Sequence, residues 1–282
     1  MKNKKGFIRL PLLIMGVFLL FVSSCKIYDR NENIIRADGT IIPKNSFIDS
    51  RDKNIYKTVK IGDQVWMAEN LRFLPSVVGS GIGSGTKPYY YVYGYDSTDV
   101  EAAKATDFYK SYGVLYNWPA IMDEDINLKV KPRGVQGVCP CGWHLPSDAE
   151  WKQLEKHIGM TEEQVNDIES RGIQEGGKLK ETEIIHWVES SKDVTNEFGF
   201  TALPGGYRGD DGKFYGNGIY GVWWSVTKID DSNTWSRSMY FNSGKIIRNY
   251  FSDQWGFSVR CIKDKNIWTR ILRKRSNTII YP

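Results

Sequence analysis

The sequence predicts an α+β domain, made mainly of antiparallel strands with one or two short helices and long loops. Strand-type alternation occurs at residues 51–72, a capped helical segment begins near residue 147, and short β-type runs continue from residue 198 to residue 261. Aromatic residues make up 13% of the chain, with 10 Trp. This composition favours a loop-rich fold with aromatic packing over a helical bundle.

Residues 51–72 are predicted to form a β-hairpin. Ile55, Val59 and Ile61 alternate with other residues, Gly62-Asp63 supplies a turn, and residues 64–67 form the returning strand. Residues 75–98 are rich in Gly, Ser and Tyr and are expected to be irregular. The aromatic run that follows at residues 112–118 is suited to burial.

Two helices are predicted after this region. Ser147 and Glu150 have the spacing of a capping box, and the helix that they begin places Trp151, Leu154 and Ile158 on one face. A second, shorter helix begins at Thr161, with Gln164 completing its cap, and it carries Val165 and Ile168.

The remaining elements are predicted strands. Residues 200–203, 222–225, 238–241 and 257–261 have strand-type composition, and Asp210-Asp211-Gly212 is expected to turn a hairpin. Consecutive residues of a strand point to opposite faces, so one ring of Trp223-Trp224 is expected inside and the other can be exposed. Tyr207, Trp223 and Trp224 are therefore the candidate ligand-binding residues, with Tyr220 nearby. The alternative is that loops cover both tryptophans.

The start of the chain is typical of an exported bacterial lipoprotein. Lys2, Lys4, Lys5 and Arg9 precede a short apolar run, and Val22-Ser23-Ser24-Cys25 resembles a lipobox. Residues 1–24 are thus predicted to be a signal peptide, Cys25 the lipidated residue, and residues 25–47 a tether. Lys26 favours sorting to the outer membrane, with the domain on the cell surface or the periplasmic side.

The net charge of +5 comes from the two ends of the chain. The signal peptide contributes +4 and residues 265–282 contribute +5, which leaves about −4 (5 − 4 − 5) for the body. A mildly acidic body argues against nucleic acid as a partner. The basic tail, residues 265–282, is either an amphipathic segment that contacts anionic lipid or an extension.

Three cysteines remain if Cys25 carries lipid. Cys139 and Cys141 are too close in sequence to bridge each other without strain, so either of them can pair with Cys261. A bridge across more than a hundred residues contributes on the order of 4–5 kcal/mol on the loop-entropy model. His144 lies near the cysteine pair, but a zinc site there lacks a fourth ligand. No metal and no cofactor is predicted.

Six ordered blocks of sequence resemble the Fibrobacter succinogenes major paralogous domain, a family found in Bacteroidetes-type lipoproteins. The resemblance spans about residues 48–264, and the blocks are residues 52–71, 116–118, 139–151, 199–208, 221–225 and 256–261. It implies an irregular fold similar to C-type-lectin-like domains and the formylglycine-generating enzyme, with the two ends of the domain meeting. The family usually has no cysteine at position 141, which implies a Cys139–Cys261 disulfide and a free thiol at Cys141.

A binding module without catalytic activity, which recognises a glycan or an envelope protein, is the function that these features favour. The alternatives are a structural component of a surface or outer-membrane assembly, and an oxidase-like enzyme on the related fold. The calcium-binding tripeptides of sugar-binding C-type lectins are absent. Arg208-Gly209-Asp210 spells an adhesion tripeptide, but turn chemistry explains it. The loop carboxylates of Asp210, Asp211, Asp230 and Asp231 are of the type that binds a hard cation, although acidic turns are usually only solvated.

Overall fold

A computed structural model describes residues 27–28, 33–35, 41–122, 134–183, 185–189 and 194–265. The predicted signal peptide, Cys25 and tail residues 266–282 lie outside these ranges. Within them, five short helices and mostly antiparallel strands form a mixed fold, which confirms the α+β prediction. No helix in the described ranges is both long enough and apolar enough to cross a membrane.

The helices and strands are short, as expected for a loop-rich domain. In chain order they are β1 (Ile27–Tyr28), β2 (Ile34–Ile35), β3 (Ile41–Ile42), β4 (Ser46–Ile48), β5 (Ile55–Ile61), β6 (Gln64–Met67), β7 (Tyr90–Tyr91), α1 (Val100–Ala105), α2 (Asp107–Tyr112), β8 (Leu115–Tyr116), α3 (Trp118–Met122), β9 (Trp143–His144), α4 (Asp148–His157), α5 (Glu162–Asn166), β10 (Glu169–Arg171), β11 (Gly205–Arg208), β12 (Phe214–Asn217), β13 (Tyr220–Lys228), β14 (Asn233–Tyr240), β15 (Ile246–Ser252) and β16 (Ile262–Lys263).

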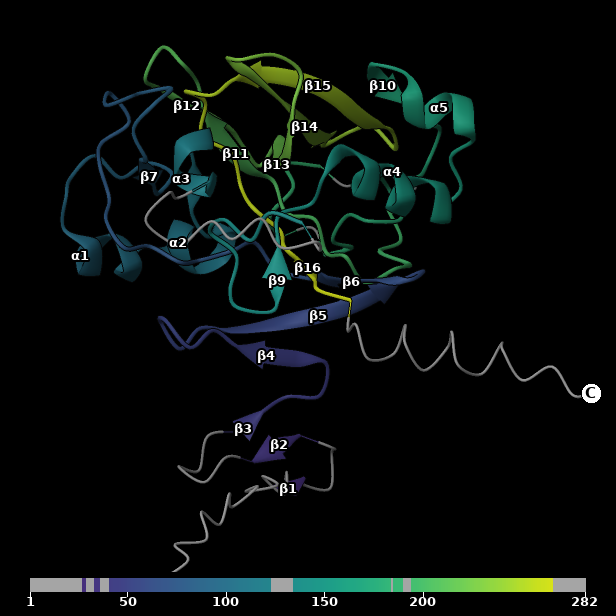
Figure 1. The fold of residues 1–282 in the computed structure, drawn as a ribbon, viewed down its shortest axis with the longest axis horizontal. Coiled ribbons are helices and arrows are strands. Elements are labelled where there is room, and N and C mark those ends of the chain that lie inside the picture. The colour runs from purple at the N-terminus through teal and green to yellow at the C-terminus, as the bar shows by residue number, and fades with distance from the viewer. Residues whose placement is uncertain are drawn as a thin grey trace, which may run out of the picture.

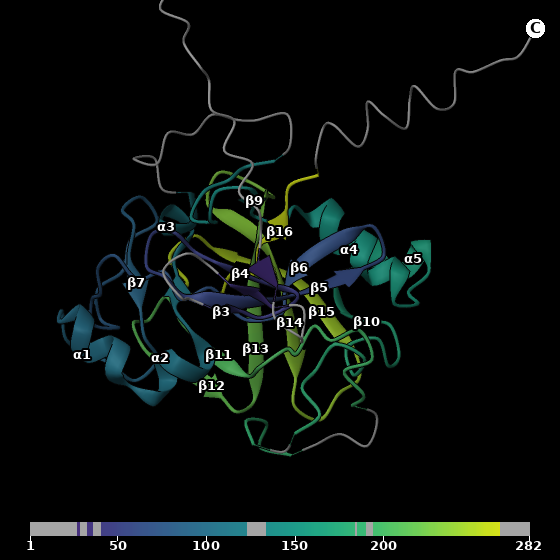
Figure 2. The ribbon, with the colours of Figure 1, turned by 90° about the horizontal axis from the view of Figure 1, so that it is seen from below.

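Two sheets make up most of the domain (Figure 1). One has six strands in the order β10-β15-β14-β13-β11-β12, and the other has five in the order β4-β5-β6-β16-β9. Strand β16, at the end of the domain, lies between β6 and β9, so the two ends of the domain meet as the resemblance implies. Seen from below, α1 and α2 flank the sheets on one side and α4 and α5 on the other (Figure 2).

Both predicted helices are confirmed. Ser147 and Thr161 begin α4 and α5 with complete capping boxes, and Trp151 and Leu154 are buried on one face of α4. The placement of Ile168 on an apolar helix face is wrong, because α5 ends at Asn166 and the Ile168 side chain is 51% exposed.

The sequence did not predict α1 and α2. Each spans six residues, and they begin at the side-chain caps of Asp99 and Thr106. Such one-turn helices are too short to show a helical period.

The hairpin at residues 51–72 is confirmed as β5 and β6, and residues 209–213 turn between β11 and β12. The expectation of a strand at residues 200–203 is wrong, since only Ala202 makes a bridge, to Lys180. Residues 257–261 do not form a regular strand either. Phe257 and Ser258 make isolated bridges to Tyr116 and Trp223, and pairing becomes regular only at β16.

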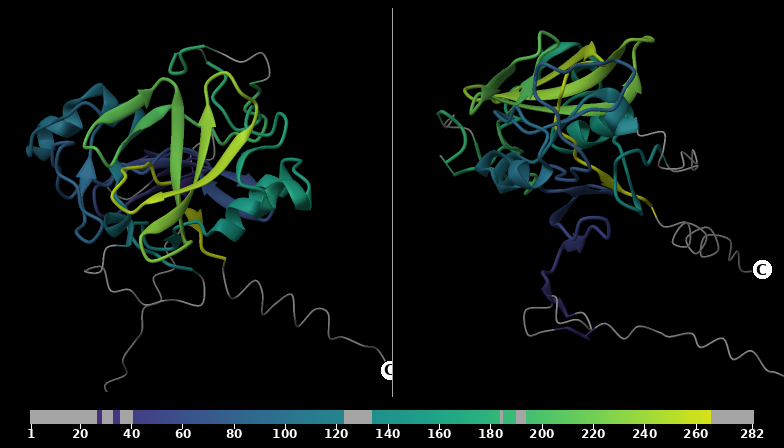
Figure 3. Two further views of the ribbon diagram at one scale, coloured as in Figure 1. Left: turned by 90° about the horizontal axis from the view of Figure 1, so that it is seen from above. Right: turned by 90° about the vertical axis from the view of Figure 1, so that its left-hand side faces the viewer.

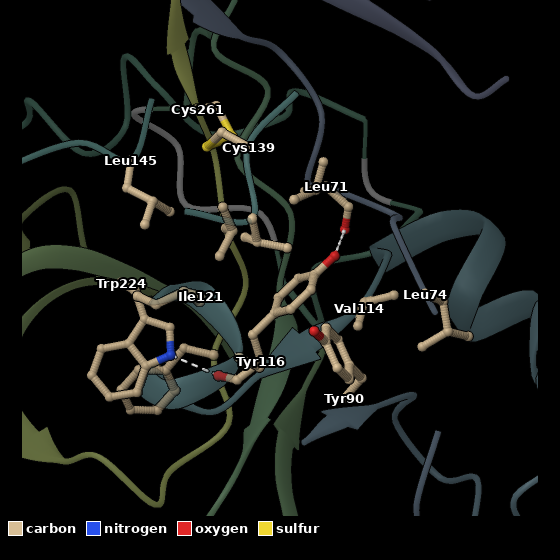
Figure 4. Packing of buried hydrophobic residues seen from close by; sticks show 14 of the residues in the cluster. Leu71, Leu74, Tyr90, Val114, Tyr116, Ile121, Cys139, Leu145, Trp224 and Cys261 are labelled. Atoms are coloured by element: carbon tan, nitrogen blue, oxygen red, sulfur yellow. Dashed lines mark hydrogen bonds between the residues drawn. A yellow bond between two sulfur atoms is a disulfide. The ribbon is translucent and has the colours of Figure 1, made fainter. Parts of the chain in front are cut away.

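The first hydrophobic core packs around the disulfide Cys139–Cys261, which is confirmed (Figure 4). Tyr116 lies at its centre, and its hydroxyl donates to the carbonyl of Leu71. Trp224 Nε1 donates to the carbonyl of Tyr116 over 2.7 Å, which attaches β13 to this core.

The second core fills the space between the six-stranded sheet, α4 and the β5–β6 hairpin. Trp66, Trp151 and Phe200 pack together there, with ring centroids 4.7–6.0 Å apart, and Trp223 contacts Phe200. Because β13 separates the two cores, both of its faces are covered.

Candidate functional site

The structure corrects the prediction for the tryptophan pair. Trp223 and Trp224 do point to opposite faces of β13, but their exposed fractions are 0% and 1%. Each ring is in a different hydrophobic core, and each indole N–H has a buried acceptor: Asn70 Oδ1 for Trp223 and the Tyr116 carbonyl for Trp224. Neither ring can therefore contact a ligand at the surface.

Tyr207, the third candidate, lies in a group of partly exposed aromatic side chains. We call this group the tyrosine surface, and it consists of Tyr207, Tyr215, Tyr220, Tyr240 and Trp255. The Tyr207 ring is 5.7 Å from Tyr215, 6.1 Å from Tyr220 and 5.5 Å from Trp255 by ring centroids. Tyr220 and Tyr240 are directly opposite on β13 and β14, with centroids 4.8 Å apart.

Strand register brings these rings together. Tyr207 is opposite Tyr215 in the β11–β12 hairpin, and Gly206 is opposite Gly221 where β11 meets β13. Gly216 has φ +68°, and a Cβ there would lie 2.8 Å from the Tyr220 ring and 3.5 Å from that of Tyr207. A glycine at this position thus leaves the space that the two rings occupy.

The hydroxyls of Tyr207, Tyr215 and Tyr220 are neutral hydrogen-bonding groups at ordinary pH. Burial raises the pKa of Tyr207 and of Tyr220 above the usual value. A hydrogen bond with Asp211 raises the pKa of the exposed Tyr215. All three phenols therefore stay protonated, and each presents one donor and one acceptor beside an apolar ring.

The turn next to the tyrosine surface carries two acidic side chains, Asp210 and Asp211, and one exposed basic side chain, Lys213. Asp211 accepts a hydrogen bond from the Tyr215 hydroxyl, and Asp210 is exposed beside it. Arg208 is only 1% exposed, and its guanidinium donates to the carbonyls of Ser80 and Gln254 over 2.8 and 3.0 Å. Because the arginine is held inside, the tripeptide Arg208-Gly209-Asp210 does not present an adhesion motif.

A buried polar network lies under β13. Asn70 Oδ1 accepts from Trp223 Nε1 and from Arg260 Nε, over 2.9 and 3.0 Å. The Arg260 guanidinium also donates to the carbonyls of Phe200 and Thr201, and it lies 4.1 Å from the Phe200 ring. Burial lowers the pKa of Arg260, yet a guanidinium stays charged in proteins. Carbonyl oxygens and aromatic ring faces hold this charge, and among the described residues no carboxylate forms an ion pair with it.

A second buried network joins α4 to the six-stranded sheet. Glu155 accepts from Arg171 over 2.7 and 3.1 Å and also from Arg237, and all three side chains are at most 3% exposed. Asp148 accepts from Arg248 over 2.9 and 3.0 Å. Although burial opposes ionisation, the hydrogen bond with Arg248 and the charge of Arg237 keep the pKa of Asp148 well below its usual range.

His144 connects the end of the domain to α4, because each of its ring nitrogens faces a carboxylate. Its Nδ1 lies 2.8 Å from Asp264 Oδ1 and its Nε2 lies 2.8 Å from Glu150 Oε1. Burial lowers the pKa of His144, but the hydrogen bonds and charges of the two carboxylates outweigh this and raise it overall. Cys139 is in the disulfide, and Cys141 is free and exposed.

The acidic turns are hydrogen-bonded within themselves. Asp230 accepts from the backbone of Ser232 and from the side chain of Asn233. Among the residues that the structure describes, no three His, Cys, Asp or Glu side chains are grouped so that they could hold a metal ion.

An open hollow of about 280 Å³ lies between the β5–β6 turn and α4. Asp63, Gln153 and His157 line it together with Ile61 and Gly62. It lacks the aromatic rings of the tyrosine surface, so we consider the latter the better candidate for recognition.

Sequence reasoning missed Tyr215, Tyr240 and Trp255. A signal for Tyr215 existed, because a hairpin that turns at residues 210–212 places it opposite Tyr207. Tyr240 and Trp255 had no such signal, since their places depend on the register of β14 and on the loop after β15.

Comparison with known proteins agrees with the sequence blocks. A search of curated proteins and a search of solved structures give no match. The model of the Fibrobacter succinogenes major domain matches residues 59–263, which is more than half of the chain. The protein therefore belongs to the Fibrobacter succinogenes major domain family.

Proposed function

We propose that this protein is a lipoprotein of the cell envelope whose domain binds a neutral glycan through the tyrosine surface. The observation that carries the proposal is the contiguous group of partly exposed rings around Tyr207. Aromatic faces with polar edges bury the apolar faces of sugar rings while their hydroxyls remain hydrogen-bonded.

The local charge defines the ligand class. Asp210 and Asp211 border the rings, and the nearest arginine, Arg208, is buried and already bonded to carbonyls. The exposed Lys213 in the same turn offsets only one of these two carboxylates, so the turn keeps a net negative charge and a neutral saccharide fits better than an anionic one.

The position of the surface suits an anchored binding module. β11 to β14 lie at the end of the molecule that is furthest from β1–β4, which follow the proposed anchor at Cys25 (Figure 1). Seen from above, no helix crosses β13 and β14 (Figure 3, left). We propose a C-type-lectin-like domain in the outer membrane, held by its lipid, with the rings directed away from the bilayer.

The test is a glycan array with the mature chain, residues 25–282, carrying Cys25→Ser in place of the lipid anchor. We expect neutral glycans to bind, with and without chelator, and Tyr215→Ala or Tyr220→Ala to reduce binding about 5- to 30-fold. Each such ring contributes about 1–2 kcal/mol of contact.

Tyr250→Ala is the matched control. Tyr250 is 42% exposed, close to the 39% of Tyr215, but its ring packs edge-on against Trp235 and away from the tyrosine surface. A blank array, or equal losses for Tyr215→Ala and Tyr250→Ala, would reject the proposal and favour a protein partner within the envelope.

A further inference from the structure

A second group of aromatic rings lies on the other side of β12. Tyr215 points toward Tyr207, whereas the adjacent Phe214 contacts Tyr93 at 5.0 Å. Rings then continue from Tyr93 to Phe108 at 5.2 Å and from Phe108 to Tyr112 at 6.1 Å. Phe108 is 36% exposed, and Tyr93 and Tyr112 are half-buried, so this group also meets solvent.

At the end of this group lies a carboxylate–imidazole pair. His186 Nδ1 is 2.7 Å from Glu181 Oε2, and their side chains are 23% and 12% exposed. In the neutral imidazole, a ring proton on Nδ1 is donated to the carboxylate, which only accepts when ionised, and Nε2 is then an acceptor. Within the described part of the chain, no side chain or carbonyl hydrogen-bonds to His186 Nε2.

The pair is attached firmly to the fold. Glu181 N donates to the Ala202 carbonyl over 3.2 Å, and so does Trp187 Nε1. Val188 N donates to the Gly218 carbonyl over 2.9 Å, at the turn between β12 and β13. The two residues that follow His186 and Glu181 itself are therefore anchored, and the acceptor is positioned before a ligand arrives.

Tyr112 completes the arrangement. Its ring meets the imidazole edge-to-face, with centroids 5.5 Å apart and an angle of 78°. Burial raises the pKa of its hydroxyl, so the phenol is neutral. An open acceptor nitrogen beside a ring face is suited to a ligand that has hydroxyl donors on an apolar ring.

We infer that Tyr112, Glu181 and His186 form a second saccharide subsite, in which His186 Nε2 accepts a hydrogen bond from a sugar hydroxyl. In this subsite the sugar ring packs against the rings of Tyr112 and Phe108, on the side of β12 opposite to Tyr207. Glu181 acts as a positioning residue, because it holds the imidazole tautomer. The ligand class rests on the proposed function, but the residues are separate from the tyrosine surface.

NMR of the mature chain with ¹⁵N-labelled histidine and ¹³C-labelled tyrosine tests both sites without mutation. The chain has only three histidines, so the imidazole signals are readily assigned. The probes are four neutral hexasaccharides: cellohexaose, maltohexaose, chitohexaose and mannohexaose. We expect at least one of them to shift the His186 Nε2 signal and leave that of the exposed His157 unchanged.

The outcomes separate this inference from the proposed function. Shifts of the Tyr215 and Tyr220 signals without a His186 shift would overturn the second subsite and leave the proposed function intact. A His186 shift alone would support the subsite and overturn recognition by the tyrosine surface. If no signal shifts with any hexasaccharide, both fail.

Variants then test the roles of the individual side chains. His186→Ala is expected to weaken binding of the active hexasaccharide about tenfold, as for the loss of one hydrogen bond, whereas His157→Ala changes nothing. Glu181→Gln is expected to move the His186 ¹⁵N signals toward a mixture of tautomers and to weaken binding, at an unchanged thermal midpoint. A tautomer that stays fixed in Glu181→Gln would refute the positioning role.

Discussion

The network around Asn70 and Arg260 and the tyrosine surface differ in how they relate to the six sequence blocks. Asn70 and Arg260 both lie in blocks, and each makes hydrogen bonds to distant parts of the chain. Tyr215, Tyr220 and Tyr240 lie between or beside the blocks and meet solvent. The blocks therefore contribute to the scaffold, while most of the candidate binding surface lies outside them.

This difference has a physical reason. A buried polar side chain must find all its partners inside the protein, so its type and geometry are tightly constrained. An exposed aromatic ring needs only a strand that positions it and a neighbouring side chain to pack against, so its type is less constrained. We therefore expect substitutions in the networks to lower the free energy of unfolding, and substitutions on the tyrosine surface to affect binding alone.

Removing the disulfide tests the scaffold most severely. Cys139→Ala with Cys261→Ala is expected to lower the free energy of unfolding by about 4–5 kcal/mol, because the bridge spans 122 residues of sequence. Denaturant unfolding measures this. Cys141→Ala, which removes only the exposed thiol, is the control and should leave stability unchanged.

Glu155→Gln is expected to destabilise the protein by about 3–5 kcal/mol. It leaves the buried cation of Arg171 without its carboxylate, and it leaves Arg237 with Asp148 as its remaining carboxylate partner among the described residues. The control is Glu162→Gln, since this exposed carboxylate pairs with Lys156 at the surface. If the two variants unfold at the same denaturant concentration, the α4 network does not stabilise the sheet.

His144→Gln tests whether the contacts of His144 with Glu150 and Asp264 stabilise the protein in a pH-dependent way. The pKa of His144 is raised in the folded state, so its contribution is complete below pH 6.5, the usual pKa, and is lost as the pH rises through the higher folded value. The stability difference between wild type and His144→Gln should thus shrink from acidic to alkaline pH. If the stability difference between the two proteins stays constant across this pH range, the pKa of His144 is not raised by folding.

Tyr215→Ala should have the smallest effect on stability. The ring is 39% exposed and the backbone of β12 does not depend on it, so the unfolding midpoint should match that of Tyr250→Ala. Glycan affinity should differ between the same two variants. A clear loss of stability in Tyr215→Ala would mean that the tyrosine surface is part of the scaffold.

Local patterns were sufficient for some elements. The capping boxes at Ser147 and Thr161, the β5–β6 hairpin and the turn before β12 were all predicted, because short-range sequence decides helix starts and tight turns. The family blocks implied the Cys139–Cys261 pair, which the residues alone left open.

Burial and the gathering of distant residues depended on tertiary structure. Alternation along β13 correctly placed Trp223 and Trp224 on opposite faces, but it could not reveal that a hydrophobic core covers each face. Glu181 meets His186 and Tyr112 only through the loop that Trp187 anchors. By itself, the sequence determined the α+β class, the family and the local turns. Exposure and long-range contacts were decided only by packing, because they depend on residues far apart in the chain.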